Sequence, residues 1–176
     1  MPVKSIASKS ACVLAAAAVC LDFGAPAAFA DARDITTKYG ELEVNYAGTA
    51  ASFEDAHEYL KTVKVPATVS YRGKAVKVTT IESEAFEDSV ATNVTVGKNV
   101  NKIEWGAFDE HRASSLTITL NSTKLTKKSQ VRGCFQGSSA TKITVKVTNA
   151  SAYSAAKKIF TKANTGSRKA ITVVKA

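Results

Sequence analysis

The chain is poor in cysteine and histidine, with three cysteines and two histidines among 176 residues. Cys12 and Cys20 lie in an N-terminal segment that we expect to be removed, and Cys134 alone remains, so no disulfide can form within the remaining chain. His57 and His111 are far apart and lack the i, i+4 spacing of zinc hydrolases. We therefore expect packing to stabilise the fold, and we expect no metal site.

Motifs that carry chemistry are also missing. The sequence has no glycine-rich phosphate loop, no Gly-x-Ser-x-Gly segment and no paired carboxylates of the kind that glycoside hydrolysis needs. Cys134 has no histidine close to it in the sequence, and its position in the repeat described below favours a small buried side chain. We therefore expect neither catalysis nor a cofactor.

The first 30 residues have the pattern of a cleavable secretory signal peptide. Lys4 and Lys9 precede an apolar stretch over residues 11–21 that is too short to span a bilayer, and Ala28-Phe29-Ala30 provides a small-x-small cleavage site. This pattern predicts cleavage after Ala30 and a secreted or cell-surface location. The remaining chain has no second apolar run that could cross a membrane.

The formal net charge is +9 at pH 7. A surplus of this size favours polyanionic neighbours, and cell-wall polymers, acidic glycans, anionic membranes and nucleic acid all qualify. A basic surface that is simply solvated explains the charge equally well. Composition alone does not choose among these alternatives.

A repeat organises the central part of the chain. Apolar and small residues recur at an offset of 22 positions, so that Val78, Ile81, Ala85, Phe86, Val94 and Val96 match Val100, Ile103, Ala107, Phe108, Leu116 and Ile118. A looser third copy follows after an offset of 27, with Cys134-Phe135 in the Ala-Phe position and Ile143 and Val145 in the paired apolar position. Unrelated sandwich strands with accidental spacing are the alternative.

The segments 78–86 and 100–108, together with Gly133-Cys134-Phe135, resemble the BspA-like leucine-rich repeat family of bacterial surface and secreted proteins. The resemblance implies right-handed solenoids without catalytic residues, some of which are adhesins. We accordingly expect a β-rich, leucine-rich-repeat-like repeat solenoid with short parallel strands over residues 63–176 and an N-terminal cap over residues 31–62. Gln130 stands where the earlier copies have isoleucine, which predicts a distorted third unit.

Capping elements are expected at both ends of this solenoid. Alternation predicts a strand at Leu42, Val44 and Tyr46 and a hairpin whose turn is Arg72-Gly73-Lys74. A short helix is predicted after Ser52, with Phe53, Ala56 and Leu60 on one side. At the C-terminal end, the pattern predicts a helix over residues 152–163 capped by Ser151, followed by a strand at Ile171 and Val173.

Two surfaces are candidate binding sites. Outward positions of the repeated strands predict a ligand face in which Thr95, Thr117 and Thr144 form one row that Lys146 extends. The inserted segment of the third unit predicts a basic edge made of Lys124, Lys127, Lys128 and Arg132, although lysines in loops commonly serve solubility. Trp105 is either a surface aromatic for glycan or protein contact or a side chain packed on the next turn.

These features favour a secreted or cell-surface binding or adhesion module without catalytic activity. The expected partner is a protein, a polyanionic glycan or a cell-wall polymer, and nucleic acid is not expected. The alternative is a structural or accessory scaffold domain that associates with another envelope protein and has no ligand of its own.

Overall fold

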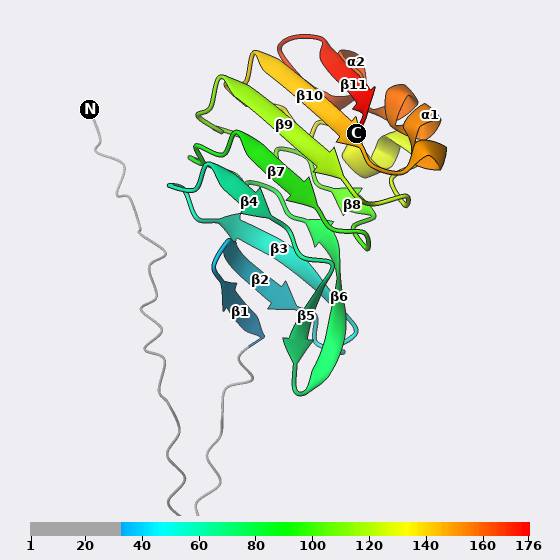
Figure 1. Cartoon of the computed structure of the whole chain (residues 1–176). Helices are drawn as coiled ribbons and strands as arrows, with labels where there is room; N and C mark the ends of the chain where they lie inside the picture. The colour runs from blue at the N-terminus through cyan, green and yellow to red at the C-terminus, as the bar shows by residue number, and fades with distance from the viewer. Residues whose placement is uncertain (1–32) are drawn as a thin grey trace, which may run out of the picture. The chain divides into compact units, whose positions relative to one another are not determined.

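The computed structural model describes residues 33–176, which belong to one compact unit (Figure 1). The predicted signal peptide and its cleavage site lie outside the described residues. Within residues 33–176, no helix has both the length and the hydrophobicity needed to cross a bilayer.

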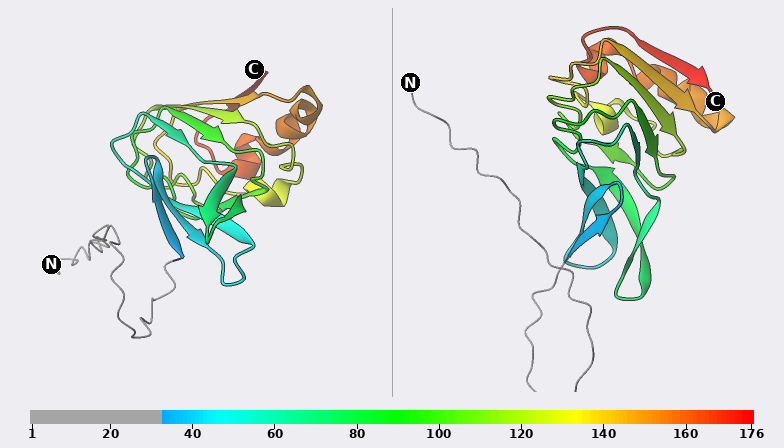
Figure 2. Two further views of the ribbon diagram at one scale, coloured as in Figure 1. Left: turned by 60° about the horizontal axis from the view of Figure 1, so that its bottom comes forward. Right: turned by 60° about the vertical axis from the view of Figure 1, so that its left-hand side comes forward.

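The first of two sheets is mixed and has six strands in the order β1-β2-β3-β6-β5, with β8 pairing with β6. Its parallel pairs are β3–β6 and β6–β8, and the other neighbours are antiparallel. The β5–β6 hairpin projects away from the second sheet, which is described below (Figure 2). The strands are β1 (Asp34–Thr37), β2 (Gly40–Val44), β3 (Ala50–Ala56), β5 (Thr68–Tyr71), β6 (Lys74–Ile81) and β8 (Lys102–Ile103).

The second sheet has five strands in the order β11-β10-β9-β7-β4, and all of its neighbours are parallel. The α1 helix contacts both β10 and β11 at one end of this sheet (Figure 1). The strands are β4 (Thr62–Lys64), β7 (Asn93–Val96), β9 (Ser115–Leu120), β10 (Lys142–Val147) and β11 (Ile171–Lys175), and the helices are η1 (Lys128–Val131), α1 (Ala150–Ile159) and α2 (Lys162–Thr165).

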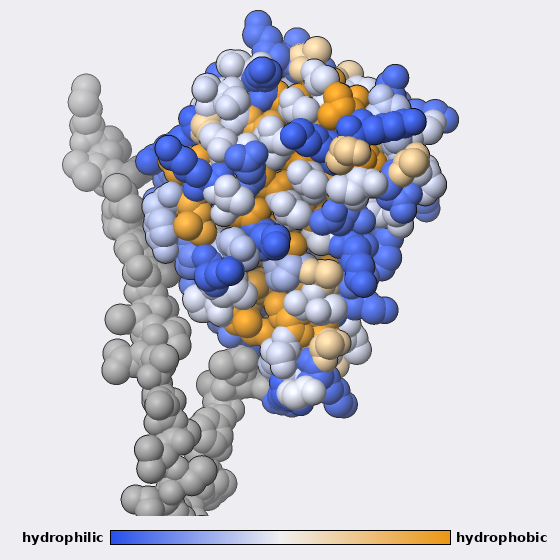
Figure 3. Space-filling view, in the orientation of Figure 1, coloured by the Kyte–Doolittle hydropathy of each residue, from blue (hydrophilic) through white to orange (hydrophobic). Residues whose placement is uncertain are grey.

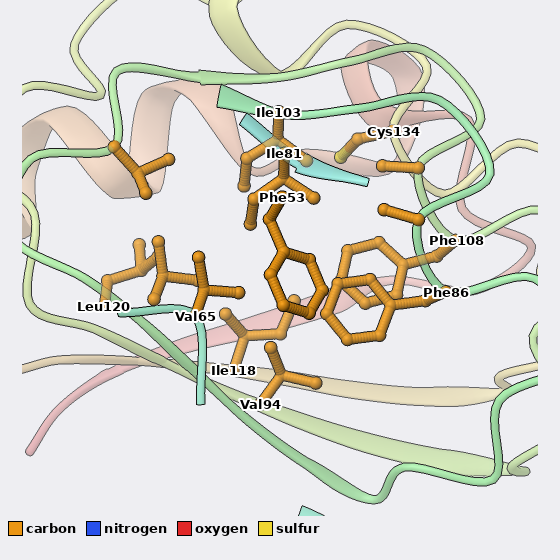
Figure 4. Close-up of a cluster of buried hydrophobic side chains, with 14 of the residues drawn as sticks. Phe53, Val65, Ile81, Phe86, Val94, Ile103, Phe108, Ile118, Leu120 and Cys134 are labelled. Carbon is orange, nitrogen blue, oxygen red and sulfur yellow. The ribbon is translucent and has the colours of Figure 1, made fainter. Parts of the chain in front are cut away.

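The hydrophobic core is filled by the inward side chains of both sheets and by a column of aromatic rings (Figure 4). Phe86 stacks on Phe108 with ring centroids 4.5 Å apart, and Phe53 and Phe135 continue the column at 5.7 and 5.2 Å. All four rings are buried. Aromatic pairs at these distances add stability beyond the area that they bury.

Small buried residues let successive turns approach closely, as the repeat predicts. Ala85, Ala107 and Cys134 are fully buried. The Phe86 amide donates to the Ala107 carbonyl at 2.9 Å, and the Phe108 amide donates to the Cys134 carbonyl at 3.0 Å. The turns that follow the mixed sheet are therefore joined by backbone hydrogen bonds at the small residues.

The predicted fold class, a repeat solenoid, is wrong. The mixed sheet is formed largely by antiparallel pairs in which β1, β2 and β5 take part, and these do not belong to a uniform repeat. The offset between paired residues also varies: it is 22 positions for Ile81 and Ile103, 24 for Val94 and Ile118, and 27 for Leu116 and Ile143.

A physical property of strands explains the error in offset. A shift of two residues leaves the same side chains facing the core, so an apolar pattern cannot distinguish an offset of 22 from one of 24. The structure pairs Val94 with Ile118, whereas the sequence pattern matched Val94 with Leu116.

The predicted helix after Ser52 is also wrong, because this segment is β3. Ala51 and Phe53 are buried and alternate with the less buried Ser52 and Glu54, and the strand pairs with both β2 and β6. Phe53 and Ala56 are compatible with a helix by spacing, but pairing on both sides overrides that local pattern. Tyr46 lies beyond the end of β2 and is 91% exposed.

Other secondary-structure elements predicted near the ends of the chain are present, although they do not cap a solenoid. β5 and β6 form the predicted antiparallel hairpin, with positive φ at Arg72 and Gly73 as a tight two-residue turn requires. α1 forms near the predicted position, but its N-cap is Asn149, whose side chain accepts from the Ser151 amide. β11 follows as predicted.

Candidate functional site

The parallel sheet presents a largely polar outer surface, which we call the threonine face: the outward side chains of its five strands. Because side chains alternate along a strand, every second residue points outward. Strand pairing aligns these residues in two rows across the sheet. One row contains Thr62, Asn93, Thr117, Thr144 and Thr172, and the other contains Lys64, Thr95, Thr119, Lys146 and Val174.

The two rows differ in charge. The first carries only neutral hydroxyl and amide groups, whereas the second has a lysine at each end of a pair of threonines. Adjacent strands lie about 4.8 Å apart, so the backbone positions of Lys64 and Lys146 are separated by roughly 14 Å. The face therefore combines closely spaced hydrogen-bonding groups with two separated lysines in the second row, and a third outward lysine, Lys142, is aligned with Ser115 at the start of β10.

No aspartate or glutamate occurs in any of the five strands of the threonine face. Pale, weakly polar residues and strongly hydrophilic ones are interspersed over these strands, with hydrophobic residues showing between them (Figure 3). An anion that approaches this surface meets hydroxyls and lysines without a fixed negative charge in the strands beneath it.

The structure changes the row that the sequence predicts. Thr117 and Thr144 are aligned, as expected, but Thr95 is aligned with Thr119 and belongs to the row of Lys146. The four predicted face residues are therefore brought together on one surface in two rows. The shift has the same cause as the change in the offset between β7 and β9.

A pocket of about 340 Å³ adjoins the lysine row at the edge of the sheet. Lys64, Thr95 and Lys98 contribute to its walls, together with apolar and amide groups from Val65, Pro66, Ala67, Gly97 and Asn121. A β-carbon at position 97 would lie 2.6 Å from the Pro66 carbonyl oxygen, so glycine is needed for the two segments to approach. The pocket offers an anionic group a partly enclosed position next to two lysines.

The predicted basic edge lies on a segment that Gln130 organises. The Gln130 amide donates to the carbonyls of Asn101 and Lys124 at 2.7 and 3.0 Å, and its oxygen accepts from the Thr126 and Lys127 amides at 2.8 and 2.7 Å. The four cations of the edge, Lys124, Lys127, Lys128 and Arg132, are all exposed. Gln130 thus replaces a buried isoleucine by a set of backbone contacts, while Val131 is buried beside it.

Negative charge gathers instead on the mixed sheet. The register of β3, β6 and β8 aligns Ser52, Thr80 and Lys102, and Glu54, Glu82 and Glu104 each lie two residues further on. Burial, followed by the charges of Glu54 and Glu104, raises the pKa of the Glu82 carboxyl above its ordinary value. Carboxylates and the lysines of the threonine face are therefore on different sheets.

Groups that could serve catalysis or metal binding are placed as structural residues. Burial raises the pKa of the Cys134 thiol far above its ordinary value, so the sulfur keeps its proton. His111 is buried and its Nε2 lies 2.8 Å from the Ala91 carbonyl oxygen. Among residues 33–176, no three His, Cys, Asp or Glu side chains are grouped so that they could hold a metal ion.

A larger pocket of about 440 Å³ lies between β2, β3 and β6. Its charged groups have partners within the protein: Arg33 pairs with Glu43 at 2.5 Å and lies 3.8 Å from the ring centre of Tyr46. An anion entering this pocket would compete with Glu43 for Arg33. The pocket on the threonine face is smaller, but it contains lysines without a carboxylate among its walls.

Sequence reasoning missed Thr62 and Lys64, which begin the two rows. A signal for them was present, because Thr62-Val63-Lys64 repeats the tripeptide Thr144-Val145-Lys146 of β10. Thr172 was missed for a related reason: its pairing with Thr144 depends on the docking of β11.

No family model, no curated protein and no solved structure matches the chain. The resemblance of residues 78–86 and 100–108 to BspA-like proteins therefore stays a prediction.

Proposed function

We propose that this protein is a non-catalytic binding module that acts outside the cytoplasm and holds an extended polyanionic polymer, an acidic glycan or a cell-wall polymer, across the threonine face. The observation that carries the proposal is the pair of aligned rows, one neutral and one with a lysine at each end, on five strands without a carboxylate. The predicted signal peptide supports an extracellular location.

The arrangement suits a long ligand rather than a small one. Threonine hydroxyls donate and accept hydrogen bonds, and their repeat of about 4.8 Å lets successive sugar hydroxyls find partners along the row. Lys64 and Lys146 add charge-assisted bonds at two separated points, and the pocket beside Lys98 accepts an acidic group at the edge. Because the strands are held in register by their neighbours, the polymer meets a surface that needs little ordering on binding.

The test compares two charge-reversed pairs of lysines. Lys64→Glu with Lys146→Glu changes the threonine face, while Lys74→Glu with Lys77→Glu makes the same change of charge on β6 of the mixed sheet. Binding of the purified protein to long polygalacturonate is measured by calorimetry at moderate salt, with neutral amylose as the control ligand.

We expect the first pair to weaken binding by about tenfold or more and the second pair by much less, because each lost charge-assisted bond is worth on the order of 1.5–3 kcal/mol. Equal losses for the two pairs would show that only the overall charge matters, and the proposal would be wrong. Complete loss of polygalacturonate binding at physiological salt would lead to the same conclusion, because attraction between solvent-exposed charges is screened beyond about 8 Å at that ionic strength.

A further inference from the structure

Trp105 is the single tryptophan of the chain, and it lies on the surface with 57% of its area exposed. It follows β8 of the mixed sheet and so lies outside the threonine face. A large exposed aromatic side chain is a common anchor for ligands, because one side of it remains free to be covered.

The indole is held in place by Gly133. A β-carbon at position 133 would lie 2.1 Å from Cδ1 and 2.6 Å from Nε1 of Trp105, so the five-membered ring occupies the space that any side chain there would need. Gly133 also has a φ of 65°, which favours glycine. The Gly106 amide donates to the Gly133 carbonyl at 2.9 Å and fixes the two turns against each other. The backbone at Gly106 and Gly133 therefore holds the Trp105 side chain at the surface.

The backbone segments that adjoin the Gly133 turn carry cations. Arg132 is exposed and directly precedes Gly133. A backbone hydrogen bond from Gly106 to Gly133 joins the turn of Trp105 to this next turn. The Gly133 amide donates to the Asn164 carbonyl at 2.9 Å, and the Asn164 side chain donates to the Lys128 carbonyl at 3.1 Å. These contacts bring α2, with Lys162, and η1, with Lys128, next to the same turn.

The C-terminal part of the chain is strongly basic. Residues 111–176 contain 13 lysines and arginines and no aspartate or glutamate. Carboxylates lie on both sides of this position: Glu104, which is paired with Lys102, precedes Trp105, and the Asp109 carboxylate lies against Gly137 of the turn that contains Gly133. An anionic group seated on the indole would have Arg132, which directly precedes Gly133, as its partner of opposite charge.

We propose that Trp105 and Arg132 form a subsite for one acidic sugar residue of a glycan. The C–H face of the pyranose ring packs on the exposed side of the indole, and the guanidinium of Arg132 pairs with the carboxylate or sulfate of the sugar in its bidentate geometry. This subsite uses residues outside the threonine face and does not depend on the function proposed for that face.

A saccharide fits better than a single-stranded nucleic acid. Nucleic-acid channels stack successive bases on successive aromatic side chains along a basic groove. Here a single indole packs on the turn that Arg132 precedes, and the other strongly exposed aromatics, Tyr46 and Tyr59, follow β2 and β3. One stacking surface with one adjacent guanidinium matches one ring with one acidic group.

The single tryptophan makes the test direct, because its fluorescence reports on this position alone. The purified protein is titrated with tetragalacturonate, with neutral maltotetraose as the matched uncharged control and with oligothymidylate as the nucleic-acid control. We expect a saturable change in emission with the acidic tetramer and no comparable change with the neutral one. A response to maltotetraose of equal affinity, or tighter binding of oligothymidylate, would overturn the assignment.

Variants then locate the contact. Arg132→Ala should weaken tetragalacturonate binding by about tenfold, whereas Arg168→Ala removes an equal charge from the α2–β11 connection and should leave the affinity nearly unchanged. In the Lys64→Glu and Lys146→Glu background, which removes the threonine face as a competing site, Trp105→Ala should abolish the binding measured by calorimetry, with circular dichroism verifying the fold. Equal effects of Arg132→Ala and Arg168→Ala, or full affinity in Trp105→Ala, would contradict the proposal.

The outcome is separable from that of the threonine face. The Lys64→Glu and Lys146→Glu pair should leave the fluorescence titration unchanged, so either proposal can fail while the other holds. Gly133→Ala provides a second check, because the added methyl group must displace the indole and shift the emission of the free protein. An unchanged emission spectrum together with unchanged affinity would show that Gly133 does not position Trp105.

Discussion

Phe86 and Phe108 are stacked with ring centroids 4.5 Å apart and with planes inclined by only 8°. They come from successive turns at the same position of the sequence pattern, and Phe108 also contacts Phe135 at 5.2 Å and His111 at 5.9 Å. Phe108 therefore links three turns within the core, and its removal should weaken the packing of all three.

Replacing Phe108 with alanine should lower the free energy of unfolding by about 3–5 kcal/mol, as expected for a buried phenylalanine whose cavity cannot collapse. Urea denaturation followed by circular dichroism measures the change. Tyr59→Ala is the matched control, because this ring is 75% exposed and its loss should cost about 1 kcal/mol or less. Equal losses for the two variants would contradict the central place of Phe108.

Three of the four rings of the aromatic column, Phe86, Phe108 and Phe135, could be predicted from the sequence because each follows a small residue at a recurring position. Phe53 could not, since its segment was predicted to be a helix. The register between β7 and β9 could not, since shifts of two residues preserve the inward side chains. The strand at Ala50–Ala56 was mistaken for a helix because Phe53 and Ala56 fit helical spacing, and its pairing with β2 and β6 is not visible in that local pattern.

Of the candidate sites, the threonine face could be predicted from the sequence, whereas the surroundings of Trp105 could not. Alternation placed Thr95, Thr117, Thr144 and Lys146 on one outer face, which the structure shows. The contact of Trp105 with Gly133 depends on how the inserted segment at residues 126–130 folds, and that path is set by the side chain of Gln130. A pattern of apolar residues contains no information on such a polar contact.

Gln130→Leu should loosen the segment that carries the basic edge. The substitution removes four hydrogen bonds to backbone groups, and at about 0.5–1.5 kcal/mol for each bond the segment should open far more readily, even with partial replacement by water. Limited trypsin digestion after Lys127 and Lys128 measures this opening, and the leucine variant should be cleaved several times faster there.

Gln130→Glu refines the same experiment. A carboxylate retains the acceptor for the Thr126 and Lys127 amides but cannot donate to the carbonyls of Asn101 and Lys124. Its cleavage rate should therefore fall between those of the parent and the leucine variant. If all three proteins are cut at the same rate, Gln130 does not hold the segment.

His111 should make the fold sensitive to mild acid. Burial, which outweighs the hydrogen bond to the Ala91 carbonyl, lowers the pKa of this imidazole from its ordinary value of 6.5. The folded state then binds the proton less tightly than the unfolded state, so stability is fully present above about pH 6.5 and is lost as the pH falls from there through the lowered pKa. Nδ1 of His111 has no hydrogen-bond partner among the described residues, so protonation there would bury an unpaired charge.

His111→Gln tests this dependence, because an amide at the same position stays neutral and can still donate toward the Ala91 carbonyl. At pH 7.5 the variant should melt a few degrees lower, since the edge contact of the imidazole with Phe108 is lost. Between pH 7.5 and pH 5 the parent should lose more of its melting temperature than the variant, and the gap between them should narrow. His57→Gln, which changes the half-exposed histidine, is the control and should melt in parallel with the parent over this range. A gap that widens on acidification would mean that His111 is charged within the fold and that its surroundings stabilise the imidazolium.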